Sequence, residues 1–188
     1  MKPISVKDLV VPLDEYAKVS EEATLYDAVR ALQESQKRFA GSIYPHRAVL
    51  VQDGSGRVVG KISMLNVLRG LEPKYEEIEG AKDMARATSR YAYFPEFMKF
   101  LREKYGLWQK PLEDLSGKAS RIKVKDIMHI PGEGEYVKED ATLDEAIHQF
   151  IMGQSQSLLV TRGSQIVGVL RLSDVFHEVC EMVRKKQP

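Results

Sequence analysis

The chain has 188 residues, of which 29% are charged and 43% are hydrophobic. This length and balance indicate one globular domain or two small ones, and they exclude wholesale disorder. The 28 Lys and Arg residues against 27 Asp and Glu leave a formal net charge of +1. Nucleic-acid-binding domains usually carry a strong basic excess, so we expect no nucleic acid among the partners.

The lone cysteine, Cys180, excludes an internal disulfide and a cysteine-rich zinc site. The four histidines show no metal-ligand spacing, and the sequence holds no recognisable catalytic motif. Residues 1–8 lack the apolar core of a signal peptide. No stretch approaches the about 18 apolar residues of a membrane helix. We therefore expect a cytoplasmic protein without metal, catalytic residues or membrane insertion.

An internal repeat organises the sequence, because three short segments recur in the same order in both halves. These segments are 6–9 and 124–127 (VKDL and VKDI), 23–29 and 141–147 (ATLYDAV and ATLDEAI), and 58–62 and 166–170 (VVGKI and IVGVL). The repeat predicts two copies of one β-α-β-β-α unit. We expect the first over residues 1–71 and the second over residues 120–188.

The first copy predicts a strand, a helix, a hairpin of two strands and a second helix. These elements are expected over residues 16–19, from 25 onward, 48–51, 58–62 and 64–71. Thr24 and Asp27 have the spacing of a capping box, in which each side chain binds the other residue's backbone N–H. Apolar residues at helical spacing follow the cap, and the residues that lengthen this copy lie mostly in 35–47.

Residues 72–119 separate the two copies. Residues 76–90 and 96–105 have helical composition. Aromatic and leucine residues, among them Trp108, are too frequent for a flexible tether. We expect a helical insertion packed on the repeats.

The second copy predicts the same elements in the same order. They are expected over residues 135–137, from 143 onward, 158–160, 166–170 and 172–186. Thr142 and Glu145 repeat the capping signal. Both final helices carry more apolar residues than one internal face needs: Leu65, Val67, Leu68, Val175, Phe176, Val179, Met182 and Val183. Such a patch predicts a twofold homodimer.

A short motif follows the glycine of each copy. Residues 60–66 read GKISMLN and residues 168–174 read GVLRLSD. Two such motifs, each after a T-L-x-D/E-A helix start, resemble those of a tandem pair of CBS domains, the module named after cystathionine β-synthase. The first copy departs from the family's pattern by Asn66 in place of an acid. The second departs by Arg171 in place of a hydroxyl side chain.

The resemblance implies an α/β fold in which the two repeats pack as one disc with pseudo-twofold symmetry. Two clefts between the repeats would each take an adenosine-containing nucleotide, with the acidic motif position on the ribose and the Ser or Thr position near phosphate. Such pairs usually dimerise and act as regulatory sensors without catalysis. The implied ligand is AMP, ADP or ATP, no cofactor is required, and the regulated target would be a separate protein.

Several motif residues have more than one possible role. Asp174 could accept both hydroxyls of a ribose or favour its helix start by its charge. Asn66 keeps one acceptor oxygen, and Ser63 could bind phosphate or cap the following helix. Arg171 could bind phosphate with two donors, plug the cleft, or pair with a neighbouring acid.

Four further residues are candidates for the ligand site. Gly60 and Gly168 are expected at strand ends, where a side chain would block a close ligand. His46 and Arg47 enter strand 48–51, and by the resemblance such entries face the cleft, where both could supply positive charge. They could also be an exposed loop end.

Three functions remain open at this point. The leading hypothesis is a regulatory module that senses an adenine nucleotide. The alternative is an interaction scaffold whose nucleotide sites are degraded by Asn66 and Arg171. A third reading is an enzyme with a site in the insertion, among its aromatic residues.

Overall fold

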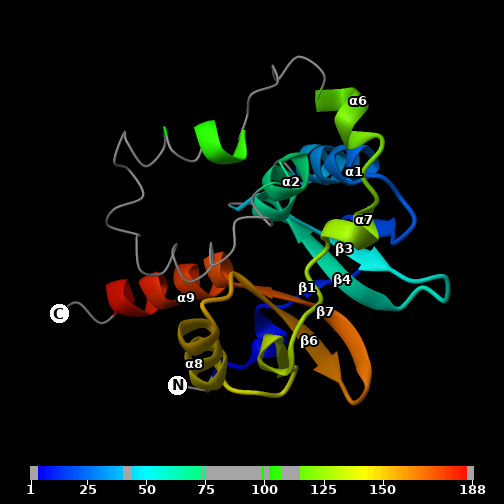
Figure 1. Ribbon diagram of the computed structural model, residues 1–188. Helices are drawn as coiled ribbons and strands as arrows, with labels where there is room; N and C mark the ends of the chain where they lie inside the picture. The colour runs from blue at the N-terminus through cyan, green and yellow to red at the C-terminus, as the bar shows by residue number, and fades with distance from the viewer. Residues whose placement is uncertain are drawn as a thin grey trace.

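The structure is a computed structural model that describes residues 4–39, 44–72, 74, 99, 102–106 and 115–185. It is a mixed α/β fold with two sheets and helices around them (Figure 1). The first half contains η1 (Val6–Asp8), β1 (Val11–Pro12), β2 (Lys18–Ser20), α1 (Leu25–Arg38), β3 (Ala48–Gln52), β4 (Val58–Ser63) and α2 (Met64–Leu71). The expected order of strand, helix, hairpin and helix is confirmed from β2 to α2.

The second half repeats this order. It contains α6 (Leu115–Ala119), α7 (Val124–Ile127), η3 (Glu133–Glu135), β5 (Tyr136–Lys138), α8 (Leu143–Gly153), β6 (Ser157–Arg162), β7 (Gln165–Arg171) and α9 (Leu172–Lys185). Within the expected insertion, α6 and residues 74, 99 and 102–105 are helical. Trp108, residues 76–90 and residues 96–98 lie outside the described residues, so the predicted helical insertion stays a prediction.

Both predicted helix starts are confirmed by reciprocal hydrogen bonds. Thr24 Oγ1 accepts from the Asp27 N–H at 3.2 Å, and Asp27 Oδ2 accepts from the Thr24 N–H at 2.9 Å. Thr142 and Glu145 make the same pair at 3.3 and 3.0 Å. These side chains satisfy N–H groups that a helix leaves without an internal partner, which fixes where α1 and α8 begin.

The two sheets exchange their leading segments. One sheet has the order β2-β3-β4, and the other has the order β1-β7-β6-β5. Strand β1 precedes β2 in the chain but pairs antiparallel with β7 of the second repeat, with Val11 opposite Val169. In the first repeat, His129 forms a bridge with Lys61 of β4. Each sheet is therefore extended by a short segment from the other half of the chain: β1 extends the sheet of the second repeat, and His129 pairs with the sheet of the first.

The hydrophobic core follows the same exchange. Val6 is fully buried against α8, β6 and α9 of the second repeat, and Val124 is fully buried against α1 and β4 of the first. Leu50 and Leu159, from the central strands β3 and β6, pack together with Tyr16 and Val169 between the sheets. The repeats thus form one packed body in which neither buries its core alone. Among the described residues, no helix has the length and apolar character needed to cross a membrane.

Candidate functional site

Asp174 and Arg171 form an ion pair at the start of α9. The guanidinium donates from Nε to Asp174 Oδ2 at 2.5 Å and from Nη2 to Oδ1 at 2.7 Å. Nη1 of the same group donates to the carbonyl oxygen of Tyr44 in the first repeat at 3.0 Å. The side chains of Arg171 and Asp174 are only 13% and 17% exposed. Of the readings considered for Arg171, pairing with a neighbouring acid is the one that this arrangement realises.

His46 lies beside this pair in a slot between two aromatic rings. Its ring stacks on Tyr16 with centroids 4.5 Å apart and on Phe39 with centroids 5.2 Å apart. Nδ1 is 2.9 Å from the hydroxyl of Ser35, and the residue is 2% exposed. Burial lowers the pKa of His46, and the nearby positive charge of Arg171 lowers it further. The expected positive charge at His46 is therefore disfavoured.

The ion pair and the slot together define what we call the Asp174 junction: Tyr16, Phe39, Tyr44, His46, Arg171 and Asp174. Burial raises the pKa of Tyr16; the positive charge of Arg171 lowers it, and the negative charge of Asp174 raises it. Residues from both repeats therefore meet here. Arg47, the neighbour of His46, is exposed. Tyr16 and Phe39 were not singled out by the sequence, because neither lies in the motif.

Ser63 and Asn66 occupy in the first repeat the motif positions of Arg171 and Asp174. Asn66 Oδ1 accepts from the Ser63 N–H at 3.0 Å and from its hydroxyl at 2.6 Å. Ser63 Oγ accepts in turn from the Asn66 N–H at 3.2 Å. The pair forms the cap of α2 that the sequence offered as one reading of Ser63. The same two positions hence form a neutral cap in one repeat and an ion pair in the other.

Gly60 and Gly168 lie within strands β4 and β7, not at their ends, because each strand continues to the motif's fourth residue. A Cβ at Gly60 would lie 2.6 Å from the sulfur of Met128, and one at Gly168 would lie 2.4 Å from the carbonyl oxygen of Val11. Val11 belongs to β1, which pairs with the second repeat, and Met128 follows α7, which packs against the first. Close approach of the chain itself thus accounts for both glycines.

A second polar cluster joins the repeats around Lys61, and the sequence did not reveal it. Lys61 Nζ donates to Glu135 Oε1 at 2.6 Å and to the carbonyl oxygen of Ser157 at 3.2 Å. The other carboxylate oxygen of Glu135 accepts from the Gly132 N–H at 3.1 Å and contacts His129 Nε2. We call Lys61, His129, Glu135 and Ser157 the Lys61 junction.

Glu135 stays charged in this setting. Burial alone would raise its pKa, but hydrogen bonds from Lys61 and His129 outweigh burial and lower it. The only signal in the sequence comes from comparing the two repeats. Lys61 of the first repeat corresponds to Val169 of the second, and Glu135 of the second corresponds to Ala17 of the first. A charged residue thus replaces an apolar one at both positions.

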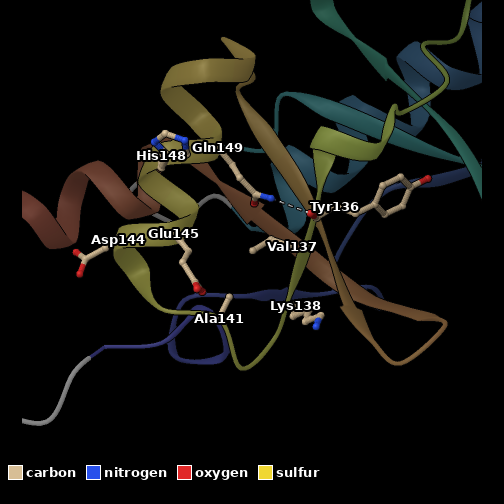
Figure 2. Close-up of a pocket in the computed structure, with 8 residues that line it drawn as sticks. All are labelled: Tyr136, Val137, Lys138, Ala141, Asp144, Glu145, His148 and Gln149. Atoms are coloured by element: carbon tan, nitrogen blue, oxygen red, sulfur yellow. Dashed lines mark hydrogen bonds between the residues drawn. The ribbon is translucent and has the colours of Figure 1, made fainter.

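A groove of about 680 Å³ lies on the flank of the second repeat, between β5 and the first half of α8 (Figure 2). Its lining residues are Tyr136, Val137, Lys138, Ala141, Asp144, Glu145, His148 and Gln149. Gln149 reaches from α8 toward β5 and donates to the carbonyl oxygen of Tyr136 at 3.2 Å. None of the motif residues lines this groove. Over the described part of the chain, no three His, Cys, Asp or Glu side chains are placed to hold a metal ion.

Comparisons with known proteins agree with this architecture. The family model named CBS domain matches residues 6–73 and 124–181. A search of curated proteins gives no match. Solved structures with the same fold include the CBS domain of a CBS domain containing membrane protein from Sphaerobacter thermophilus. It is 18% identical, with 94% of this chain and 88% of that chain covered and a TM-score of 0.59.

Two further structures are of the CBS-pair protein CBSX2. The structure from Arabidopsis thaliana is 16% identical, with coverage of 97% of this chain and 99% of that chain and a TM-score of 0.59. CBSX2 in complex with AMP is 18% identical, with coverage of 96% and 98% and a TM-score of 0.56. With both repeats matched by the family model and the fold shared with these structures, the chain belongs to the CBS domain family as a tandem pair of CBS domains.

Proposed function

We propose that this CBS pair is a regulatory module that binds an adenine nucleotide at the Asp174 junction and has no catalytic activity of its own. CBS-pair proteins are generally regulatory and nucleotide-binding, and the related CBSX2 has been solved with AMP. The observation that carries the proposal is the position of Asp174. It is a largely buried carboxylate in the first turn of α9, within a group of residues from both repeats.

The chemistry of the junction suits a nucleotide. The two oxygens of Asp174 can accept from the two hydroxyls of a ribose once Arg171 releases them. Arg171 can then bind phosphate with two parallel donors. Among the other candidates, His46 and Arg47 enter from the first repeat, whereas the space beside Gly168 is taken by Val11 of β1.

The first repeat is the weaker candidate for a nucleotide. The acceptor oxygen of Asn66 already binds both donors of Ser63. Ser63 and Asn66 would have to exchange the cap of α2 for ligand contacts, and the space beside Gly60 is taken by Met128. We therefore assign the principal site to Asp174.

A ligand at this position would change contacts in both repeats. Arg171 currently bonds to Asp174 in the second repeat and to the Tyr44 carbonyl in the first. A ligand that takes over either contact favours a different arrangement of the repeats, in proportion to its preference for that arrangement. The output would pass to a separate target protein, through a homodimer of this chain.

Exposed apolar residues support the homodimer. Leu65 and Leu68 on α2 are 55% and 56% exposed, and Phe176 and Val183 on α9 are each 62% exposed. Other members of the expected patch do not contribute, since Val175 is buried and Val67 and Met182 pack against the core.

A scaffold without a nucleotide is the second candidate function. It is favoured by the fact that Arg171 and His46 already satisfy the groups a nucleotide would use. In that case the Asp174 junction would serve only to hold the repeats together.

Isothermal titration with adenosine, AMP, ADP and ATP separates the two functions. We expect binding by the wild type, and a roughly 10- to 150-fold loss of affinity in Asp174→Ala, because a hydrogen bond to a charged group contributes about 1.5–3 kcal/mol. Asp144→Ala is the matched control, since Asp144 is an exposed acid in the first turn of α8. Absence of heat with every ligand at millimolar concentration would leave the scaffold as the function.

The first repeat can be tested in the same titration. Asn66→Asp restores a carboxylate at its motif position. If a weak ribose site exists there, this change strengthens binding and adds to the measured stoichiometry. If binding does not change, the first repeat carries no site.

A further inference from the structure

The slot that holds His46 is built for one flat ring. Tyr16 comes from the segment before β2, and Phe39 follows the last turn of α1. The rings of Tyr16 and His46 are nearly parallel, at 10°, and those of Phe39 and His46 are inclined by 26°. A heteroaromatic ring thus stacks on two aromatic side chains, and Nδ1 at its edge shares a hydrogen bond with the hydroxyl of Ser35.

The backbone around His46 is tethered on both sides. Gln36 Nε2 donates to the carbonyl oxygen of His46 at 2.6 Å, and Arg171 donates to the carbonyl oxygen of Tyr44 at 3.0 Å. The ring of Tyr44 lies edge-on to His177 of α9, with centroids 6.2 Å apart. Arg171 therefore links the segment that carries His46 to Asp174.

Each group that would recognise a nucleoside already has an internal partner here. The two aromatic walls hold an imidazole, and the two oxygens of Asp174 hold guanidinium donors. We propose that His46 and Arg171 form an internal plug of the Asp174 junction: the imidazole takes the place of a ligand's base, and the guanidinium takes the place of its sugar hydroxyls. This inference rests on the proposed function, and it adds that the structure shows the state in which the plug occupies the nucleotide site.

A plug within the same chain weakens ligand binding without any loss of contacts. The apparent dissociation constant equals the intrinsic constant divided by the fraction of molecules in which the slot is open. Removing the plug therefore tightens binding, whereas removing a true ligand contact weakens it. The sign of the change distinguishes the two roles of His46.

The first test is His46→Ala, which leaves a ring-sized space between Tyr16 and Phe39. Calorimetry with adenosine should show affinity higher than in the wild type by about tenfold or more. Free imidazole should raise the melting temperature of this variant but not of the wild type, because it refills the slot and binds only the folded state. His148→Ala is the matched control, since His148 is exposed on α8, and it should behave as the wild type.

The second test is Arg171→Ala, which leaves the ring stack in place and keeps the proposal testable if His46→Ala does not fold. Freed from Arg171, Asp174 should bind adenosine more tightly, by about tenfold. AMP should gain less than adenosine, because its phosphate loses the guanidinium.

The outcomes separate this inference from the proposed function. If adenosine binds the wild type more tightly than both variants, His46 and Arg171 are ligand contacts: the plug is overturned and the proposed function stands. If His46→Ala gains neither adenosine affinity nor stabilisation by imidazole, the plug is likewise overturned. If imidazole stabilises this variant while no adenine ligand binds any form, the slot is real and the adenine assignment alone is wrong.

Discussion

Lys61 and His129 exchange both of their backbone hydrogen bonds, at 3.0 and 2.9 Å, across the junction between the repeats. The corresponding pair in the other sheet is Val169 and Val11. The backbone arrangement is therefore shared, whereas the side chains differ: an ammonium that reaches Glu135 in one place and apolar packing in the other. Apolar side chains satisfy this geometry, so the charges of the Lys61 junction are an addition to the fold.

This relationship predicts a double-mutant cycle with large coupling. Lys61→Val alone should lower the free energy of unfolding by about 1.5–3 kcal/mol, because it leaves a largely buried carboxylate without its ammonium. Lys61→Val combined with Glu135→Ala installs the residues of the other half, and it should cost less than the sum of the single changes. Urea unfolding measures all four proteins.

An exposed ion pair is the control for this cycle. Arg162 and Glu139 make two hydrogen bonds, at 2.6 and 2.8 Å, but the Arg162 side chain is 70% exposed. Their coupling should stay below about 1 kcal/mol. Equal coupling in the two cycles would contradict the view that burial distinguishes the Lys61 junction.

The two motif glycines predict unequal costs of substitution. In Gly168→Ala the new methyl group meets the backbone oxygen of Val11 at 2.4 Å, so strand β1 must move, at about 1–3 kcal/mol. In Gly60→Ala the nearest atom is the sulfur of Met128, a flexible side chain that can turn away. Thermal unfolding should rank Gly168→Ala as the less stable protein. Gly54→Ala, with nothing within 4 Å of the added atom, should lie within about 0.5 kcal/mol of the wild type.

The local parts of this structure could be predicted from the sequence. The capping boxes of Thr24 and Thr142 depend on residues three positions apart, and the pairing of Arg171 with Asp174 has the same spacing. Such contacts are formed within one helical turn, so spacing and chemistry suffice to propose them. Gly60 and Gly168 were found by their repetition, but their reason was not, because it depends on Met128 and Val11.

The contacts between the repeats could not be predicted in this way. Lys61 and Glu135 are 74 positions apart in the sequence, and Arg171 and Tyr44 are 127 positions apart. Nothing in the sequence near Val6 indicates that it is buried in the second repeat. These pairings depend on how the sheets exchange segments, which local propensity does not determine.

Acid should destabilise the protein through His46. Burial and Arg171 lower the pKa of His46 in the folded protein below its ordinary value of 6.5, which applies to the unfolded chain. Below that value the unfolded chain binds the proton more readily, so the free energy of unfolding falls as the pH falls, until the folded pKa is passed. Each unit of lowered pKa contributes about 1.4 kcal/mol.

Urea unfolding between about pH 8 and pH 5 measures this loss. His46→Phe keeps a ring between Tyr16 and Phe39 but cannot be protonated, so its stability should depend less on pH in this range. The charged groups facing His46, Arg171 and Asp174, are unchanged in the variant. A wild type and variant with parallel pH profiles would show that His46 is protonated without leaving its slot. A separate loss of stability is expected below about pH 4.5, where Glu135 is protonated in the unfolded chain before it is protonated in the folded protein, because folding lowers its pKa.

The exposed apolar faces of α2 and α9 predict a homodimer. Leu65 and Leu68 are three positions apart, and Phe176 and Val183 are seven apart, so each pair lies on one face of its helix. A second copy of the chain would remove these side chains from water, which stabilises the dimer by about 25 cal/mol for each Å² of apolar surface buried.

Sedimentation at tens of micromolar protein, on the order of ordinary dimer affinities, should show a dimer. Phe176→Glu and Leu68→Glu should each shift it toward monomer, because a charge in the interface must lose its hydration. Lys37→Glu, on the exposed side of α1, should leave the dimer intact. A wild type that sediments as a monomer, or variants that dimerise as it does, would place the contact elsewhere or remove it.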